Sequence, residues 1–367
     1  MSVVFYISGH GFGHAVRQFA IVNELARRAP DLPIHIVTAV SRPLAERSLP
    51  PGVPVRPAVL DTGAVQRGSL DVDIEATLRE AATFHGDLDR KADEEARALE
   101  ACGARFAVAD IPPLAFVAAA RAGIPAVGVA NFTWDWIYEG YEEAARLAPG
   151  LVEQLRQAYA LGLEAWRMPF AGGFEGFRVV RDLPLVARKA RHERAAVRET
   201  LGLPQDVPLA LVSLGGFGAR GIDVPAAGAD LRGVAEVVVT SYDAVPESPG
   251  VQRVDEAHLY ASGFRYEDLV AAVDVVVSKP GYGIVSDCAA NGTRLLYTSR
   301  GRFREYEVLV AGMRSCVASA FIDPVALRAG RWREPMIALL KLSAVAPPRS
   351  DGAAVAAEWI LGGLSPT

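Results

Sequence analysis

The sequence predicts an α/β protein made of two doubly wound parallel-sheet domains that face one another across a cleft. Three observations lead to this prediction. The chain has 367 residues, a length for which two domains are the natural expectation. Short apolar runs alternate with longer amphipathic stretches in both halves, which indicates right-handed βαβ units. A similar glycine-rich turn, S-x-x-G-F-G, also follows the first predicted strand of each half, at residues 8–13 and 213–218.

The elements of the first half follow from hydrophobic patterning. Short runs of β-branched and aromatic residues predict buried parallel strands at 3–7, 34–38, 106–109 and 126–129. Amphipathic stretches predict helices at 14–28, 74–101 and 114–122. The glycine-rich turn at 8–13 therefore lies at the carboxyl edge of a parallel sheet, where doubly wound folds bind ligands.

The second half repeats this plan. Strands are predicted at 209–213, 237–240, 275–278 and 295–298, and helices at 266–272, 281–291 and 304–311. Residues 181–208 are rich in Arg and Pro, which is typical of a linker between domains. A last amphipathic helix at 351–361 follows the Pro347-Pro348 break.

Composition excludes several classes of protein. The formal net charge is −5, from 38 Lys and Arg against 43 Asp and Glu, which does not favour a nucleic-acid partner. The three cysteines are widely spaced and form neither a disulfide framework nor a metal-ligand pattern. No apolar stretch is long enough for a membrane span, and the N-terminal apolar run fits a strand better than a signal peptide. We expect a cytoplasmic protein without stable membrane insertion, whose oligomeric state the sequence leaves open.

The first glycine-rich turn does not match a dinucleotide fingerprint. Its spacing is G-x-G-x-G, and no acidic residue ends the second predicted strand to hold a ribose. A Walker A loop is absent. His10 and His14 have the spacing of helical metal ligands, but Gly11 and Gly13 disfavour a helix across them and no third ligand is near. No cofactor and no metal are therefore expected.

His14 and Asp110 are the candidate catalytic pair. His14 lies where the turn becomes the first helix, and an imidazole there can act as a general base. Asp110 ends a strand at the same edge, where a carboxylate can orient that imidazole and stabilise its charge. Both residues also have structural interpretations: His14 can brace the turn, and Asp110 can cap the next helix.

The segment 278–287 is the strongest candidate for anion binding. A buried strand runs through Lys279, a proline and two glycines into a helix, and bare amides at a helix N-terminus attract anions. Asp287 lies one turn further along, where we expect a solvent-facing cleft carboxylate able to hold a ribose diol. The structural alternative is an ordinary strand-to-helix turn.

Two further segments are less specific. Residues 131–136 place two tryptophans close to Asn and Asp after a strand, an arrangement found both in hydrophobic cores and in sugar platforms. The charged run at 300–307 is typical of a solvated helix start.

Three of these segments, 8–17, 131–136 and 279–287, resemble the glycosyltransferase-like N-terminal half of plant L-arabinokinases, in the same order along the chain. More distantly, the chain is similar to the lipid-linked N-acetylglucosaminyltransferase of cell-wall synthesis and to other UDP-sugar transferases. The resemblance implies a GT-B fold. It assigns residues 1–186 to an acceptor-binding domain, 187–207 to a linker, 208–346 to a donor-binding domain and 347–367 to a helix that packs back on the first domain.

The resemblance also implies roles for individual residues. His14 matches the loop histidine that serves as base, and Asp110 falls near its orienting acid. Asp287 matches the glutamate that holds the donor ribose, and is one methylene shorter. The donor-binding set is expected to comprise Gly215, Gly216, Phe264, Lys279, Gly281, Tyr282, Gly283, Ser286, Asp287 and Glu305, the last meeting donor sugar hydroxyls. The acceptor-side loop set is expected to comprise His10, Gly11, Gly13, Arg17, Asn131, Trp134 and Asp135.

The sequence thus predicts a metal-independent glycosyltransferase that uses a nucleoside diphosphate sugar, with UDP the expected nucleotide. Inversion at the anomeric carbon is expected if the base acts directly. The acceptor, a small molecule or a glycoside, has no recognisable code. The kinase half of the arabinokinases is missing, so sugar-kinase activity is not implied. Two alternatives stay open: a nucleotide-sugar epimerase or hydrolase, and a nucleotide-sugar sensor without turnover.

Overall fold

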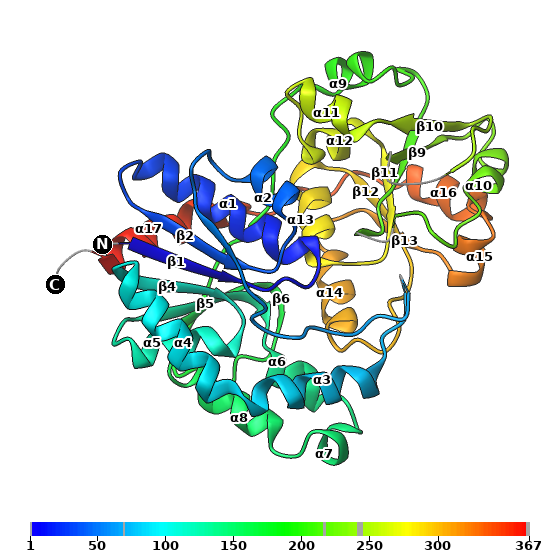
Figure 1. The fold of residues 1–367 in the computed structure, drawn as a ribbon. Helices are drawn as coiled ribbons and strands as arrows, with labels where there is room; N and C mark the ends of the chain where they lie inside the picture. The colour runs from blue at the N-terminus through cyan, green and yellow to red at the C-terminus, as the bar shows by residue number, and fades with distance from the viewer. Residues whose placement is uncertain (1, 69, 216–217, 241–244, 365–367) are drawn as a thin grey trace.

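The computed structural model describes residues 2–68, 70–215, 218–240 and 245–364. It contains two separate β-sheets, both flanked by helices (Figure 1). Neighbouring strands pair in parallel throughout both sheets. The predicted architecture of two doubly wound parallel-sheet domains is confirmed.

The first sheet has seven strands in the order β3-β2-β1-β4-β5-β6-β7. Its strands are β1 (Ser2–Ile7), β2 (Ile34–Thr38), β3 (Val55–Pro57), β4 (Ala104–Asp110), β5 (Ala126–Phe132), β6 (Glu164–Gly172) and β7 (Val180–Asp182). The helices of this half are α1 (Phe12–Arg28), α2 (Arg42–Ser48), α3 (Ile74–Gly86), α4 (Leu88–Ala101), α5 (Pro113–Arg121), α6 (Trp134–Glu139), α7 (Ala144–Leu147) and α8 (Leu151–Tyr159).

The second sheet has six strands in the order β10-β9-β8-β11-β12-β13. Its strands are β8 (Leu209–Val212), β9 (Glu236–Thr240), β10 (Val251–Val254), β11 (Val275–Ser278), β12 (Arg294–Tyr297) and β13 (Ser319–Phe321). The remaining helices are α9 (Arg194–Thr200), α10 (Val224–Asp230), α11 (Glu256–Ala261), α12 (Tyr266–Ala272), α13 (Tyr282–Asn291), α14 (Glu305–Met313), α15 (Pro324–Arg328), α16 (Arg333–Leu340) and α17 (Gly352–Leu364).

The pattern-based prediction missed the outer strands and joined two helices. β3, β7 and β13 have only three residues each, and β6 and β10 are only partly buried, so none shows the continuous apolar run of a central strand. The predicted helix at 74–101 is two helices, because the chain turns at Asp87, which has non-helical backbone angles between α3 and α4.

Strand register brings the candidate residues of the first half to one edge. Ile7, the last residue of β1, pairs with Thr38 of β2 on one side and with Asp110 of β4 on the other. The loop after β1 and the end of β4 therefore lie side by side. In the second half, Ser278 at the end of β11 pairs with Tyr297 of β12, which places the loops that follow them next to one another.

The two halves pack against each other through apolar side chains. The Phe132 ring at the end of β5 lies 6.2 Å from that of Tyr282 and 6.4 Å from that of Phe303, both in the second half. α13 lies beside α1 in the middle of the molecule (Figure 1). The C-terminal helix α17 contacts α1 and β4, and Ile360 is buried in the same core as Phe5 and Phe19 of the first half. No helix within the described ranges is long and apolar enough to cross a membrane.

Candidate active site

His14 and Asp110 are in contact, as the sequence analysis expected. The Nδ1 atom of His14 lies 3.1 Å from Oδ1 and 3.2 Å from Oδ2 of Asp110. The Asp110 side chain is fully buried and that of His14 is 13% exposed. The carboxylate accepts the Nδ1 proton, which leaves Nε2 as the ring nitrogen able to take a proton from a substrate. Asp110 does not cap the next helix, since α5 starts after Pro112 with no side-chain cap.

The structure reveals a second histidine–carboxylate pair that sequence reasoning missed. His10 Nε2 lies 2.9 Å from Oδ1 of Asp61 and 2.8 Å from the Asp61 carbonyl oxygen. Burial lowers the pKa of His10, but the hydrogen bond and the charge of Asp61 outweigh it and the pKa is raised. The only sequence signal for Asp61 is an acidic residue between Leu60 and Gly63, shortly after an exposed three-residue strand.

Asp61 is a buried anchor for the loop that carries His10. Ser8 Oγ donates to both of its carboxylate oxygens, at 3.0 and 2.9 Å, and the Trp134 indole donates to Oδ2 at 3.0 Å. Trp134 is 2% exposed and its ring stacks on Tyr138. Of its two interpretations, the structure favours core packing over a sugar platform, because a buried ring has no free face for a sugar.

The other acceptor-side candidates from the 131–136 segment are also engaged. Asn131 donates from Nδ2 to the Pro169 carbonyl at 2.7 Å. Asp135 is fully buried and forms an ion pair with Arg156 at 3.2 Å. Burial raises the pKa of Asp135, against hydrogen bonds and the Arg156 charge, which oppose it. These contacts engage the polar side chains of the segment within the first half of the molecule.

The turn between β11 and α13 is open for a ligand at Gly281. A Cβ built on Gly281 meets nothing within 4 Å, and its backbone is extended with φ −147°. α13 starts at Tyr282 without a side-chain cap, so the first amide groups of the helix lack a partner within it. The Tyr282 hydroxyl donates to the Phe170 carbonyl at 2.8 Å, which ties this turn to the first half.

Lys279 and Glu305 lie in one charged cluster at this turn. Lys279 Nζ donates to Gln66 Oε1 at 3.2 Å, a contact from the second half to the first. Burial, together with the nearby Arg300 charge, lowers the pKa of Lys279 to about 8, and Glu305 opposes the shift. Glu305 is 2% exposed and forms an ion pair with Arg300. Contact between Glu305 and donor sugar hydroxyls therefore requires this buried carboxylate to become accessible.

Asp287 is buried, and the expectation of a solvent-facing carboxylate is wrong. It is 2% exposed and is held by Arg188 from the linker: the Arg188 backbone amide lies 3.2 Å from Oδ1, and the guanidinium pairs with both carboxylate oxygens. Burial opposes protonation of Arg188, but the charges of Asp287 and Glu267 outweigh it and raise its pKa. As the structure stands, Asp287 fastens the linker to the second half, and a contact with ribose would require Arg188 to move.

We therefore expect Asp287→Ala to destabilise the protein. Removing one partner of a buried ion pair leaves the other charge unpaired, which costs roughly 3–5 kcal/mol. Chemical denaturation measures the loss. Asp182→Ala is the matched control, because Asp182 is 77% exposed and its partner Arg167 is 42% exposed, so its loss changes stability by less than about 1 kcal/mol. Equal stability of the two variants would contradict the structural role of Asp287.

The remaining donor-side candidates are less directly placed at the turn. Phe264 is buried with its ring 4.9 Å from that of His192 in the linker, and Ser286 is 3% exposed within α13. Gly215 has φ +69°, a left-handed conformation that favours glycine. Gly216 lies outside the described residues. The structure therefore leaves the second glycine-rich turn only partly described.

The two halves of the molecule meet at the candidate site through a pair of glycines, Gly13 and Gly283. A Cβ built on Gly283 would lie 3.0 Å from the Cα of Gly13, so the first turns of α1 and α13 approach each other without room for a side chain at Gly283. Gly11, just before α1, has φ +90°. The arrangement brings the His14 dyad of the first half close to the turn of the second half.

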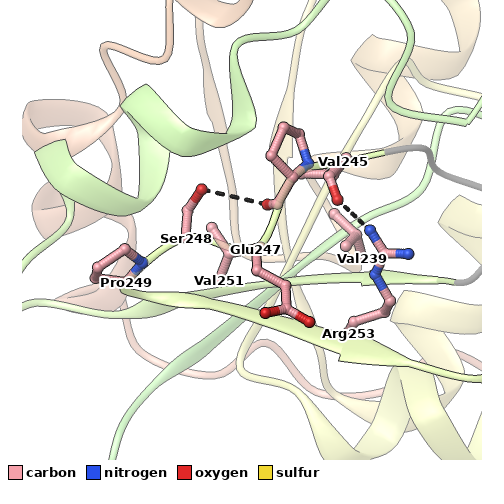
Figure 2. A pocket seen from close by; sticks show the side chains of 8 residues that line it. Val239, Val245, Glu247, Ser248, Pro249, Val251 and Arg253 are labelled. Carbon is pink, nitrogen blue, oxygen red and sulfur yellow. Dashed lines mark hydrogen bonds between the residues drawn. The ribbon is translucent and has the colours of Figure 1, made fainter.

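Other features of the surface lie apart from this arrangement. A pocket of about 490 Å³ is lined by residues of β9 and β10 and by residues 245–249, and Figure 2 shows Arg253 donating to the Val245 carbonyl at its side. None of the candidate residues lines it. Across the described part of the chain, no group of three or more His, Cys, Asp or Glu side chains is arranged to hold a metal ion.

Three curated relatives share sequence with this chain. It is 31% identical over 308 residues to an L-arabinokinase of Arabidopsis thaliana, which covers 82% of the chain and 28% of that relative. It is 32% identical over 199 residues to a UDP-N-acetylglucosamine–N-acetylmuramyl-(pentapeptide) pyrophosphoryl-undecaprenol N-acetylglucosamine transferase of Clavibacter michiganensis, which covers 50% of the chain and 47% of the transferase. The chain thus spans less than half the length of either of these two relatives. No protein-family model matches it.

Solved structures share its fold over nearly the whole length. The glycotransferase of kitacinnamycin superposes with a TM-score of 0.64 at 16% identity, covering 99% of both chains. Phytolacca americana UGT2, complexed with UDP-2fluoro-glucose and pterostilbene, gives a TM-score of 0.61 at 12% identity, covering 100% of this chain and 94% of the other. The chain therefore has the GT-B glycosyltransferase fold, and the resemblance of its motifs to L-arabinokinases and to the N-acetylglucosamine transferase is confirmed by sequence similarity.

Proposed function

We propose that this protein is a glycosyltransferase that moves a sugar from a nucleoside diphosphate sugar to a hydroxyl acceptor, with UDP the expected nucleotide. The observation that carries the proposal is the position of the His14–Asp110 dyad next to the turn that opens α13. A base and an anion site that meet across two halves are what this reaction requires. The relatives add support, since one is named as a UDP-N-acetylglucosamine transferase and a structural neighbour binds UDP-2fluoro-glucose.

In the proposed reaction, His14 Nε2 accepts the proton of the acceptor hydroxyl as its oxygen attacks the anomeric carbon. The bond from that carbon to the diphosphate oxygen breaks, and its electron pair leaves with the diphosphate. Asp110 stays ionised and stabilises the imidazolium that forms, 3.1 Å from Nδ1. A single displacement of this kind inverts the anomeric configuration.

In this proposal, the turn that opens α13 stabilises the negative charge of the leaving diphosphate. Amides at the start of the helix and the nearby Lys279 provide positive potential that is in place before the reaction. A bound diphosphate would also favour the charged form of Lys279, whose pKa burial lowers to about 8. In this proposal, Lys279 and the α13 amides stabilise the charge of the diphosphate in place of a divalent cation.

Incubation of the purified protein with a panel of nucleotide sugars and hydroxyl acceptors tests the proposal. A transferase releases nucleoside diphosphate at a rate that depends on the acceptor, and forms a glycoside that mass spectrometry detects. Release at the same rate without acceptor would identify a hydrolase. A new sugar epimer without release would identify an epimerase, and binding without any turnover would identify a sensor.

We expect this turnover to persist in EDTA. Lys279 and the α13 amides take the position at the diphosphate that a metal ion occupies in metal-dependent transferases. The measurement is the initial rate with and without a molar excess of EDTA, followed by addition of Mg²⁺ or Mn²⁺. A rate that falls in EDTA and recovers with either metal would show that the protein does not supply this charge alone.

A further inference from the structure

Arg17 is a buried cation that has no carboxylate partner among the described residues. It lies on α1, one turn after the candidate base His14, and only 4% of it is exposed. Its Nε and Nη2 atoms are buried and form no hydrogen bond with any described residue. A buried guanidinium is normally paired, because removing a charge from water is costly unless hydrogen bonds and an opposite charge compensate.

The surroundings of Arg17 add positive potential. Its guanidinium lies 5.6 Å from the ring centroid of Tyr282, the first residue of α13. A Cβ built on Gly13 would lie 3.6 Å from Arg17 Nη1 and 3.5 Å from the Gly283 amide nitrogen. The side chain therefore reaches the place where the N-termini of α1 and α13 meet. Both helix ends carry partial positive charge, which favours an anion.

Anionic side chains close to this place are already engaged. Burial and the charge of Glu305 raise the pKa of the Tyr282 hydroxyl, and the charges of Arg17 and Arg300 lower it. Glu305 itself forms its ion pair with Arg300. Asp110 accepts from His14, and Asp61 accepts from His10. None of these carboxylates bonds to Arg17 in the described part of the chain, so the available acceptor for its donors is an anionic ligand.

We propose that Arg17 binds the diphosphate of the donor, reaching it from the first half of the molecule. The inference rests on the proposed function and changes the role of Arg17, which the sequence analysis placed with the acceptor-side residues. The planar guanidinium suits two parallel hydrogen bonds to phosphate oxygens. Lys279 and the α13 amides belong to the second half, so the complete diphosphate site is formed by both halves together.

In this arrangement, stabilisation of the leaving diphosphate depends on contact between the two halves of the molecule. As the anomeric carbon–oxygen bond breaks, the electron pair passes to the terminal phosphate oxygen, whose negative charge grows. Arg17 then strengthens its hydrogen bonds to that phosphate while the neighbouring His14 takes the acceptor proton. The leaving group is stabilised fully only when α1 and α13 lie together, as they do in this structure.

Isothermal titration with UDP and UMP tests the assignment, on the wild type and on Arg17→Gln. We expect UDP affinity to fall roughly 10- to 100-fold, because a charge-assisted bidentate contact is lost. UMP lacks the terminal phosphate, and its affinity should change less than about 2-fold. The matched control is Arg47→Gln: Arg47 also comes from the first half and lies over a tyrosine of the second, Tyr260, but is paired with Glu256 at 3.8 Å. This control should bind both nucleotides as the wild type does.

Thermal unfolding without ligand separates a binding role from a structural one. A buried cation that is retained to bind a ligand destabilises the ligand-free protein, so Arg17→Gln should unfold at the same or a higher temperature than the wild type. Unchanged UDP affinity in Arg17→Gln, or equal losses for UDP and UMP, would overturn the assignment while leaving the proposed donor intact. A lower unfolding temperature in the variant would also overturn it, in favour of a structural role. A wild type that binds neither UDP nor dTDP would instead remove the proposed function itself.

Discussion

His14→Ala is expected to lower turnover by roughly 10²- to 10⁴-fold, the usual contribution of a general base. Donor affinity should hardly change, because the base acts on the acceptor proton only in the transition state. Single-turnover measurement of glycoside formation, together with UDP titration on the same preparation, gives both quantities. The geometry supports this expectation, since Asp110 accepts from Nδ1 at 3.1 Å and directs Nε2 to the substrate.

Two further variants separate catalysis from bracing of the turn. Asp110→Asn should reduce turnover less than His14→Ala, because it disturbs orientation and charge but leaves the imidazole in place. His258→Ala is the control, as His258 is an exposed histidine bonded to the Thr200 carbonyl at 3.2 Å, and it should keep wild-type turnover. If His14→Ala unfolds at a lower temperature but retains most of its rate at low temperature, His14 only braces the turn.

Gly281→Val is expected to abolish UDP binding without loss of stability. A Cβ at Gly281 meets nothing within 4 Å, and its extended φ of −147° suits a β-branched residue. The isopropyl group would instead occupy the space through which phosphates approach the α13 amides. Loss of two charge-assisted hydrogen bonds, each worth roughly 1.5–3 kcal/mol, weakens UDP binding by at least about 100-fold.

The matched control for this variant is Gly362→Val. A Cβ at Gly362 also meets nothing within 4 Å, and the residue lies on α17, far along the chain from the turn. Both variants should fold, as circular dichroism and thermal unfolding report, and only Gly281→Val should lose UDP binding. Retained UDP affinity in well-folded Gly281→Val would mean that the phosphates do not approach this turn.

The central strands and the contact between His14 and Asp110 could be predicted because their signals are local. Buried parallel strands form continuous apolar runs, and a polar residue at the end of such a run must lie at the sheet edge. This reasoning placed His14 next to Asp110 although 96 residues separate them. It failed for the short outer strands β3 and β7, whose residues are largely exposed and carry no apolar run.

Ion pairs between distant segments could not be predicted in the same way. Arg188 contacts Asp287 although 99 residues separate them, and no pattern in the sequence around either residue predicts that contact. Asp61 lies 51 residues from His10, in a stretch without regular structure. The exposure of a charged side chain depends on such partners, which is why Asp287 was expected in solvent. Arg17 illustrates the reverse case: its helix was predicted, but its burial without a partner is visible only in the folded chain.

The most direct test of the proposed donor site is a crystal structure of the protein with UDP. We expect diphosphate oxygens about 2.7–3.2 Å from the amides of Tyr282 and Gly283 and from the Arg17 guanidinium, with the outer phosphate turned toward His14. UDP bound elsewhere, for example in the pocket between β9 and β10 with its phosphates away from both glycine turns, would contradict it.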